Sequence, residues 1–400
     1  MKKSLFKRFK GWLLSFVLID LISIITRGVE STFTKDNKLL TLFFTEKNFA
    51  DNSRYFLEYL QSNPHHGYKI RILIQHKLLF QQIESLYPQI SHYSKSFSGF
   101  KLFFKTKNIV ISHGSDASYF FPYFLNIHSK NIINLWHGIP IKRLSLQVKG
   151  IREGKSRNRF QKFSAICAAS IFEQFLLASC FDMHIDDVWL TGTPRNDYLL
   201  SPNNNLVHVH PYLSKKVILY APTWREYGKH SSFFPFEDKD MSAINNFLIR
   251  EDAYLLLRGH REEMELISSN YSQNESFSRI MSADQELFPD VQQLLPYTDV
   301  LLTDYSSIYF DYLLVDKPII FLPYDLEEYQ LYRGFLFDYD AHTPGVKVFN
   351  QLDFLKELEM SLNIPETRSE ERSRMRDLFH IYQNGGSSAR ILMQINKLNS

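Results

Sequence analysis

The chain has 400 residues, a length that suits two domains. With 44% hydrophobic and 22% charged residues it has the composition of a globular protein, which excludes collagen-like and disordered classes. The formal net charge of +3 gives no overall indication of nucleic-acid binding. Cys167 and Cys180 lie in apolar stretches without metal-ligand spacing, so we expect two buried thiols in a reducing cytosol, with neither a disulfide scaffold nor a zinc site.

The first 28 residues form a basic and then apolar segment. Five basic residues stand among the first ten, and an apolar run of about 15 residues, interrupted by Asp20, follows from Gly11 to Ile25. A spanning helix needs about 20 apolar residues, and the sequence after Ile25 is a poor cleavage site. We therefore expect a helix that lies in the membrane interface, with Trp12 at the headgroups. A true span and an ordinary core helix stay open as alternatives.

Short runs that are apolar on both faces alternate with helical stretches along the rest of the chain. This pattern is typical of parallel strands covered by helices, and it predicts two doubly wound α/β domains. The strands expected in the first half are Leu39–Phe44, Ile70–Ile74, Asn108–Ser112, Ile132–Trp136, Ala165–Ala168 and Val188–Thr191. Those expected in the second half are Val217–Tyr220, Ala253–Leu257, Asp299–Leu302, Pro318–Leu322 and, more weakly, Val346–Phe349.

A turn-rich stretch at Ser201–Ser214, with two prolines and three successive asparagines, marks the expected domain boundary. The predicted division is therefore a membrane-associating segment at 1–28, a first domain at 29–200 and a second domain at 201–400. The charged residues from Glu366 onward predict terminal helices.

Five polar clusters follow predicted strands, where doubly wound sheets bind ligands. They are the segments 136–143, 192–197, 220–225, 257–261 and 303–307. In the last of these, a strand ends in Asp304-Tyr305-Ser306-Ser307 before a helix, which would offer hydroxyl and N–H groups to a phosphate. A plain serine N-cap is the alternative interpretation. The cluster lacks the glycines of a Walker loop or a dinucleotide fingerprint.

His137 and His260 stand at strand ends, one in each predicted domain, with Arg or Lys nearby. A lone histidine is more often structural than catalytic. Their matching positions nevertheless favour a pair of groups that holds a pyrophosphate from two sides.

The ordered series of motifs resembles the CDP-glycerol glycerophosphotransferases, the primases and polymerases of teichoic acid and related capsule synthesis. Over about residues 105–345 the series reads WHGIP-IKRL, GTPRND, LYAPTWRE, LRGH, LLTDYSS-IYFDY, KPIIFLPYDLEEY and RGFLFDY. The sequence departs from many relatives beside the functional positions, with Ile139 and Ile141 in the first motif and Gly259 before His260. These changes lie beside the functional residues, so they leave the chemistry in place. They do not allow the identity of the donor and of the acceptor to be carried over from the relatives.

The resemblance implies a GT-B-type fold, in which two Rossmann-like domains face each other across a cleft. It also implies a peripheral or monotopic enzyme at the cytoplasmic face of a bacterial membrane. Its donor would be CDP-glycerol or another CDP-alditol, and its acceptor a polyprenyl-diphosphate-linked glycan or the growing polymer. The first domain would face acceptor and membrane, and the second would hold the nucleotide.

The resemblance also implies roles for particular residues. His137 and His260 match the two histidines on which the family's chemistry depends. Ser306 and Ser307 match its donor-phosphate seat, and Arg333 matches a phosphate-binding arginine.

Three further residues, Thr223, Arg225 and Asp304, lie in motifs that line the donor site. We predict an in-line attack of an acceptor hydroxyl on the alditol-bearing phosphorus, with His137 as general base and CMP as leaving group. His260, Arg333 and the serines would stabilise the phosphates. The sequence requires no protein-bound metal, and a Mg²⁺ carried by the donor phosphates stays open.

The stretch from Lys142 to Lys162 has eight basic residues and one acid. We predict that it binds the acceptor's diphosphate or anionic headgroups, and a solvated charged face is the alternative. The residues concerned are Lys142, Arg143, Arg152, Lys155, Arg157 and Arg159.

Two other functions remain as alternatives. One is a sugar transferase of similar fold that uses a nucleotide-sugar, and the other is a membrane-associated scaffold without activity. The combined WHG and DYSS series favours alditol-phosphate transfer over the first, and the intact histidines and serines argue against the second.

Overall fold

The computed structural model describes residues 28, 32–113, 130–148, 163–201, 206–225, 233–259 and 277–399. The membrane-associating segment predicted at 1–28 therefore lies outside the described residues, apart from Gly28. Among the residues that are described, no helix is both long and apolar enough to cross a bilayer.

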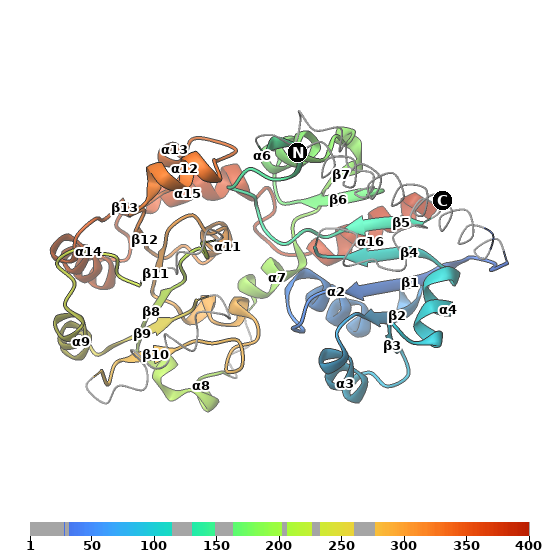
Figure 1. Ribbon diagram of the computed structural model, residues 1–400, viewed down its shortest axis with the longest axis horizontal. Coiled ribbons are helices and arrows are strands. Elements are labelled where there is room, and N and C mark those ends of the chain that lie inside the picture. Colours follow the sequence, from blue (N-terminus) through green and yellow to red (C-terminus); the bar gives the residue numbers. More distant parts are fainter. Residues whose placement is uncertain are drawn as a thin grey trace, which may run out of the picture. The chain divides into compact units, whose positions relative to one another are not determined.

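The described strands form two sheets (Figure 1), and the pairings within β1–β6 and within β8–β13 are parallel. The first has the order β3-β2-β1-β4-β5-β6-β7 and the second the order β10-β9-β8-β11-β12-β13. The strands of the first sheet are β1 (Asp36–Phe44), β2 (Lys69–Ile74), β3 (Ser91–Tyr93), β4 (Thr106–Ile111), β5 (Asn131–Asn134), β6 (Ala165–Ala168) and β7 (Val188–Leu190). Those of the second are β8 (Lys216–Tyr220), β9 (Ala253–Leu257), β10 (Ile280–Ser282), β11 (Val300–Thr303), β12 (Ile319–Phe321) and β13 (Val346–Lys347).

Helices connect the strands in both halves of the chain. Within and after the first sheet they are α2 (Asp51–Ser62), α3 (Lys77–Leu86), α4 (Phe97–Lys105), α6 (Ile171–Phe181), α7 (Pro194–Leu200) and α8 (Leu206–Val209). The later ones are α9 (Met241–Arg250), α11 (Ile308–Tyr312), α12 (Leu326–Tyr332), α13 (Tyr339–His342), α14 (Gln351–Asn363), α15 (Ser369–Phe379) and α16 (Ser387–Asn399). The predicted terminal helices are confirmed as α15 and α16.

Every predicted strand is present, and so the parallel α/β architecture is confirmed. The sequence pattern missed β3 and β10, two strands of three residues that close one edge of each sheet. Edge strands of this length carry too few buried residues to give a periodic signal.

The second sheet is buried on both faces by separate apolar clusters. Along β8, Val217 and Leu219 belong to one cluster, whereas Ile218 and Tyr220 belong to the other. Because successive side chains of a strand point to opposite faces, both faces must be covered. This explains why the strand reads as a continuous apolar run.

The described residues fall into two compact units that do not divide at residue 200. The first unit takes residues up to 136 together with 158–166 and 392–400, and the second takes 137–157 and 167–391. Backbone and aromatic contacts bind the stretch after β6 into the second unit: Ile381 N–H donates to Ala169 O, and Phe172 packs edge-on against Phe379. The predicted ranges 29–200 and 201–400 each contain one sheet, and as domains they stay a prediction.

Both cysteines are buried and free, as the sequence predicted. Burial raises the pKa of the Cys167 thiol and of the Cys180 thiol to about 12, so both remain protonated and unreactive at neutral pH.

Candidate functional site

His137 follows the end of β5 in a turn that its neighbours hold in place. Trp136 has a left-handed φ of 60°, a strained conformation for a bulky residue. Asn134 Oδ1 accepts a 2.8 Å hydrogen bond from Trp136 N–H, and Asn52 Nδ2 donates to Trp136 O at 2.8 Å. The half-buried His137 is therefore presented by a fixed backbone.

Gly138 places the histidine motif beside the predicted phosphate seat. Its φ of +133° suits glycine, and a Cβ there would lie 2.7 Å from Arg195 Nη2 and 3.1 Å from Ser307 Oγ. A side chain at this position would force Arg195 Nη2 to move and would crowd Ser307 Oγ. The second unit thus brings the first and fifth sequence clusters together, although 169 residues separate Gly138 from Ser307.

Ser306 and Ser307 lie half-buried between β11 and α11. The Ser307 side chain makes no capping hydrogen bond to α11, and Ser306 Oγ receives only a long 3.4 Å bond from Ile308 N–H. The simple N-cap interpretation therefore does not account for Ser307. Since α11 spans only five residues, hydroxyl groups rather than a long helix dipole would have to contact a phosphate.

Thr223 and Asp304 join β8 to β11, where the strand order of the second sheet reverses. Asp304 Oδ1 accepts hydrogen bonds from Thr223 N–H at 2.7 Å and from Tyr305 N–H at 2.5 Å. Ligands of doubly wound sheets bind at such reversal points. The two residues fix the loops on which Ser306 and Ser307 lie.

Arg225 is enclosed by protein groups. Its guanidinium lies 2.9 Å from Asp304 Oδ2 and donates to both oxygens of Asp325 at 2.8 Å. The rings of Tyr305 and Tyr329 lie 5.0 and 5.2 Å from its Cζ. Burial opposes the charge, but these carboxylates raise the pKa of Arg225 above its ordinary value. Two carboxylates already neutralise this cation, which favours a structural part for a residue predicted to bind the donor.

Lys142 and Arg143 pair with the segment that follows Arg333. Lys142 forms an antiparallel bridge with Phe335, and Arg143 N–H donates to Gly334 O at 3.1 Å. Gly334 has a φ of +69°, and a Cβ there would lie 3.0 Å from Arg143 Cδ. The first motif and the Arg333 motif, far apart in sequence, are thus neighbours. The half-buried Arg333 ends α12, where its N–H donates to Tyr329 O at 2.8 Å.

Several predicted residues lie outside the described part of the chain. They are His260 of the fourth cluster and the basic residues Arg152, Lys155, Arg157 and Arg159.

Arg258, two residues before His260, donates to Ala283 O and Phe288 O at 2.9 and 2.8 Å, and burial lowers its pKa to about 10. Its side chain therefore anchors the end of β9.

A buried polar cluster that the sequence analysis did not assign lies behind the histidine motif. Arg195 pairs with Asp311 at 2.6 Å, and Gln292 Nε2 donates to the same carboxylate at 2.9 Å. Glu173 lies close enough to interact electrostatically with both charges, and its Oε2 accepts a 2.6 Å bond from Ala169 N–H. Arg195 belongs to the GTPRND motif. Its position just after a strand was the only feature of the sequence that could have indicated its place in this cluster.

We expect the wild type to become less stable as the pH rises because of Glu173, and the variant Glu173→Gln to lack this effect. Burial raises the pKa of Glu173 to about 8, against opposing effects of the Ala169 N–H and Arg195. The native pKa of Glu173 lies above the value of about 4.5 that the residue has in the unfolded chain. The protonated carboxyl therefore contributes its full stability to the folded state below about pH 4.5, and this contribution is lost as the pH rises through about 8. The wild type should therefore lose up to about 4–5 kcal/mol between these limits.

The measurement is urea unfolding at pH 5, 6, 7 and 8. The glutamine amide mimics the protonated carboxyl, so the variant should lack this component of the pH dependence. Glu370→Gln, an exposed change on α15, is the matched control and should leave the pH dependence unchanged. Parallel curves for wild type and Glu173→Gln would contradict the prediction.

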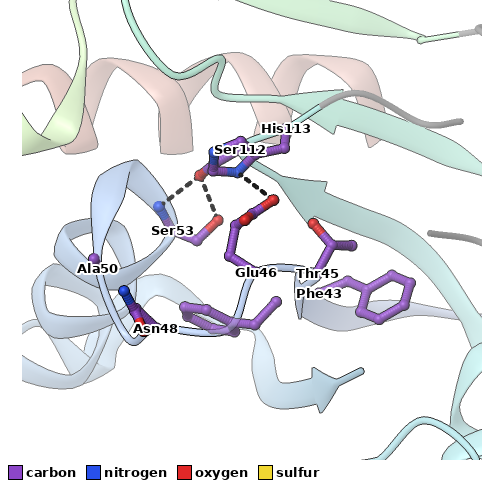
Figure 2. Close-up of a pocket in the computed structure, with 9 residues that line it drawn as sticks. Phe43, Thr45, Glu46, Asn48, Ala50, Ser53, Ser112 and His113 are labelled. Carbon is purple, nitrogen blue, oxygen red and sulfur yellow. Dashed lines mark hydrogen bonds and ion pairs between the residues drawn. The ribbon is translucent and has the colours of Figure 1, made fainter. Parts of the chain in front are cut away.

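The first unit has a shallow pocket of its own at the carboxyl ends of β1 and β4, where the order of the first sheet reverses (Figure 2). His113 ring nitrogens lie 3.7 Å from Glu46 Oε1 and 3.4 Å from Asp51 Oδ2. The hydroxyls of Ser53 and Ser112 lie 2.6 Å apart. Sequence reasoning missed this pocket, because Glu46, Asp51 and Ser53 are 59 or more residues away from Ser112 and His113 along the chain. Among the described residues there is no group of three or more His, Cys, Asp or Glu placed to hold a metal ion.

Comparison with known proteins gives one consistent result. Residues 25–397 match the family model of CDP-Glycerol:Poly(glycerophosphate) glycerophosphotransferase. The chain is 29% identical over 287 residues to a teichoic acid glycerol-phosphate transferase of Staphylococcus aureus (strain NCTC 8325 / PS 47), covering 66% of this chain and 71% of that protein. It is 25% identical over 401 residues to a teichoic acid poly(glycerol phosphate) polymerase of Bacillus spizizenii (strain ATCC 23059 / NRRL B-14472 / W23), covering 95% and 97%.

A solved structure of the wall teichoic acid polymerase TagF has the same fold, with a TM-score of 0.71 at 24% identity over 91% of this chain and 90% of that one. Some relatives are much longer, and the chain spans 48% of a Staphylococcus epidermidis polymerase. Since the family model covers nearly the whole chain, this protein belongs to the CDP-glycerol:poly(glycerophosphate) glycerophosphotransferase family of teichoic acid enzymes.

Proposed function

We propose that this protein transfers glycerol phosphate, or a related alditol phosphate, from a CDP-alditol to a hydroxyl group of a membrane-linked acceptor in cell-envelope polymer synthesis. The observation that carries the proposal is the convergence of His137-Gly138, Ser307 and the Arg333 motif in one compact unit of a chain from this family. A base and a phosphate seat that adjoin each other are what in-line phosphoryl transfer requires.

In the proposed reaction an acceptor oxygen attacks the phosphorus that carries the alditol. The new P–O bond forms as the P–O bond to CMP breaks, and His137 takes the proton of the attacking hydroxyl. Ser306, Ser307 and Arg333 would hold the phosphate oxygens and stabilise the CMP that leaves, together with His260. Thr223 and Asp304 would shape the donor side, and Arg225 would hold it together through its buried ion pairs.

The acceptor would be a polyprenyl-diphosphate-linked glycan or the growing polymer. We propose that the chain has a GT-B-type fold, and that the pocket at Glu46 and His113 serves the acceptor side. The protein would act at the cytoplasmic face of the membrane. Residues 1–28 would anchor it, and the basic residues from Lys142 to Arg159 would bind anionic headgroups or the acceptor's diphosphate.

A nucleotide-sugar transferase is the second candidate. The fold recurs over 90% of this chain in a UDP-N-acetylglucosamine 2-epimerase, with a TM-score of 0.54 at 14% identity, which is a likeness of fold alone. The histidine motif at His137-Gly138 and the serine motif at Ser307 lie side by side, and this favours alditol-phosphate transfer instead.

The test is CMP release by the full-length protein with a lipid-linked acceptor analogue. CDP-glycerol, CDP-ribitol and a nucleotide-sugar are supplied in separate reactions, each with an acceptor-free control. Acceptor-dependent CMP release from one CDP-alditol would support the proposal and identify the donor. Consumption of the nucleotide-sugar alone would overturn it.

A further inference from the structure

Arg195 has no part in the proposed chemistry, yet its side chain joins the two motifs that do. The guanidinium Nη1 donates a 2.7 Å hydrogen bond to His137 O, and Nη2 donates a 2.6 Å bond to Asp311 Oδ2. The side chains of Arg195 and Asp311 are only 11% and 6% exposed, so water competes little for these bonds. Charge-assisted bonds of this geometry are strong and directional.

The Asp311 end of this bridge fixes the helix that follows the serines. Asp311 lies on α11, four residues after Ser307, and its Oδ2 also accepts a 2.9 Å bond from Gln292 Nε2. The ring of the buried His380 bonds to Phe310 O at 2.7 Å. The position of α11, and with it that of Ser307, therefore depends on buried polar contacts at two successive residues.

The His137 end fixes the turn that presents the imidazole. His137 O is the carbonyl next to the Gly138 N–H, and a Cβ on Gly138 would lie 2.7 Å from Arg195 Nη2. The guanidinium thus fills the space under this turn. Removing it would free the carbonyl of His137 and leave a void beneath Gly138.

Another polar residue of the same motif, Asp197, makes a different contact. Asp197, also on α7, accepts hydrogen bonds from Ser387 N–H at 3.1 Å and Ser388 N–H at 3.3 Å, at the start of α16. It touches neither His137 nor α11 in these bonds. Asp197 is therefore a matched control on the same helix.

We propose that Arg195 is a positioning residue that sets the distance between the His137 turn and Ser307 by bonding to His137 O and Asp311 together. This inference deepens the proposed function and rests on it for its kinetic consequence. Arg195→Lys is the informative variant, because a lysine keeps the positive charge beside Asp311 but cannot reach both acceptors in the fork geometry of arginine.

The first experiment needs no activity. Hydrogen–deuterium exchange of the full chain is followed by mass spectrometry in peptides that cover residues 137–144. We expect exchange there to be about tenfold faster in Arg195→Lys than in the wild type, the change expected for one lost charged hydrogen bond. Asp197→Asn should leave these peptides at the wild-type rate. Unchanged exchange in Arg195→Lys, or an equal increase in both variants, would overturn the proposal.

The second experiment separates positioning from general destabilisation by a double-mutant cycle. Arg195→Lys should lower kcat for CMP release by about 10–100-fold in the wild type, because small misplacements of a reacting group are costly. In a His137→Ala background the same change should cost less than about threefold, since the group that it positions is absent. An equal loss in both backgrounds would overturn the inference. If the wild type releases no CMP from any CDP-alditol, the proposed function is wrong. The hydrogen-exchange result would still show whether Arg195 holds the His137 turn.

Discussion

Replacing His137 by alanine is expected to lower acceptor-dependent CMP release by about 10²–10⁴-fold, the usual contribution of a general base. The turn at Trp136 and Gly138 is held by the side chains of Asn134 and Asn52, so the deletion removes the imidazole without removing these contacts. The loss should appear in kcat, because the imidazole takes the proton only as the new bond forms. Steady-state CMP release at saturating CDP-alditol measures it.

The matched control is His208→Ala, a change at a histidine on the exposed side of α8. It should keep CMP release within about twofold of the wild type, as surface substitutions usually do. Wild-type kcat in His137→Ala would remove this histidine from the mechanism and assign the base to another residue.

Replacing Arg225 by methionine is expected to destabilise the second unit by about 3–5 kcal/mol. Asp304 is 1% exposed, and its carboxylate would be left buried without its cation. The aromatic rings packed around the guanidinium would lose a partner as well. Urea unfolding followed by tryptophan fluorescence would show the loss.

A second change should reverse part of this effect. Adding Asp304→Asn to Arg225→Met removes the uncompensated charge, so the double variant should be more stable than Arg225→Met alone. Arg374→Met, an exposed arginine on α15, should change stability by less than about 0.5 kcal/mol. If Arg225→Met unfolds like the wild type but raises KM for the CDP-alditol, Arg225 binds the donor rather than the surrounding carboxylates.

The order of helices and strands could be predicted from the sequence, because it depends on which residues along each short segment are apolar and become buried. The runs at Ile218–Tyr220 and Val300–Leu302 are apolar on both faces, and the two faces of the second sheet indeed belong to separate clusters. The motif series from Trp136 to Tyr339 likewise led to the family, which the match over residues 25–397 confirms. Such patterns depend on neighbours along the chain, so no tertiary information is needed to read them.

The tertiary structure alone decided which polar residues meet. Nothing in the sequence joins Arg195 to both His137 O and Asp311, or gives Arg225 two buried carboxylates, because these pairs are separated by 58 to 116 residues. The sequence placed Arg225 with the donor-binding groups and gave Arg195 no role. A guanidinium can bind a ligand or a protein carboxylate equally well, and only the fold determines which anion lies within its reach.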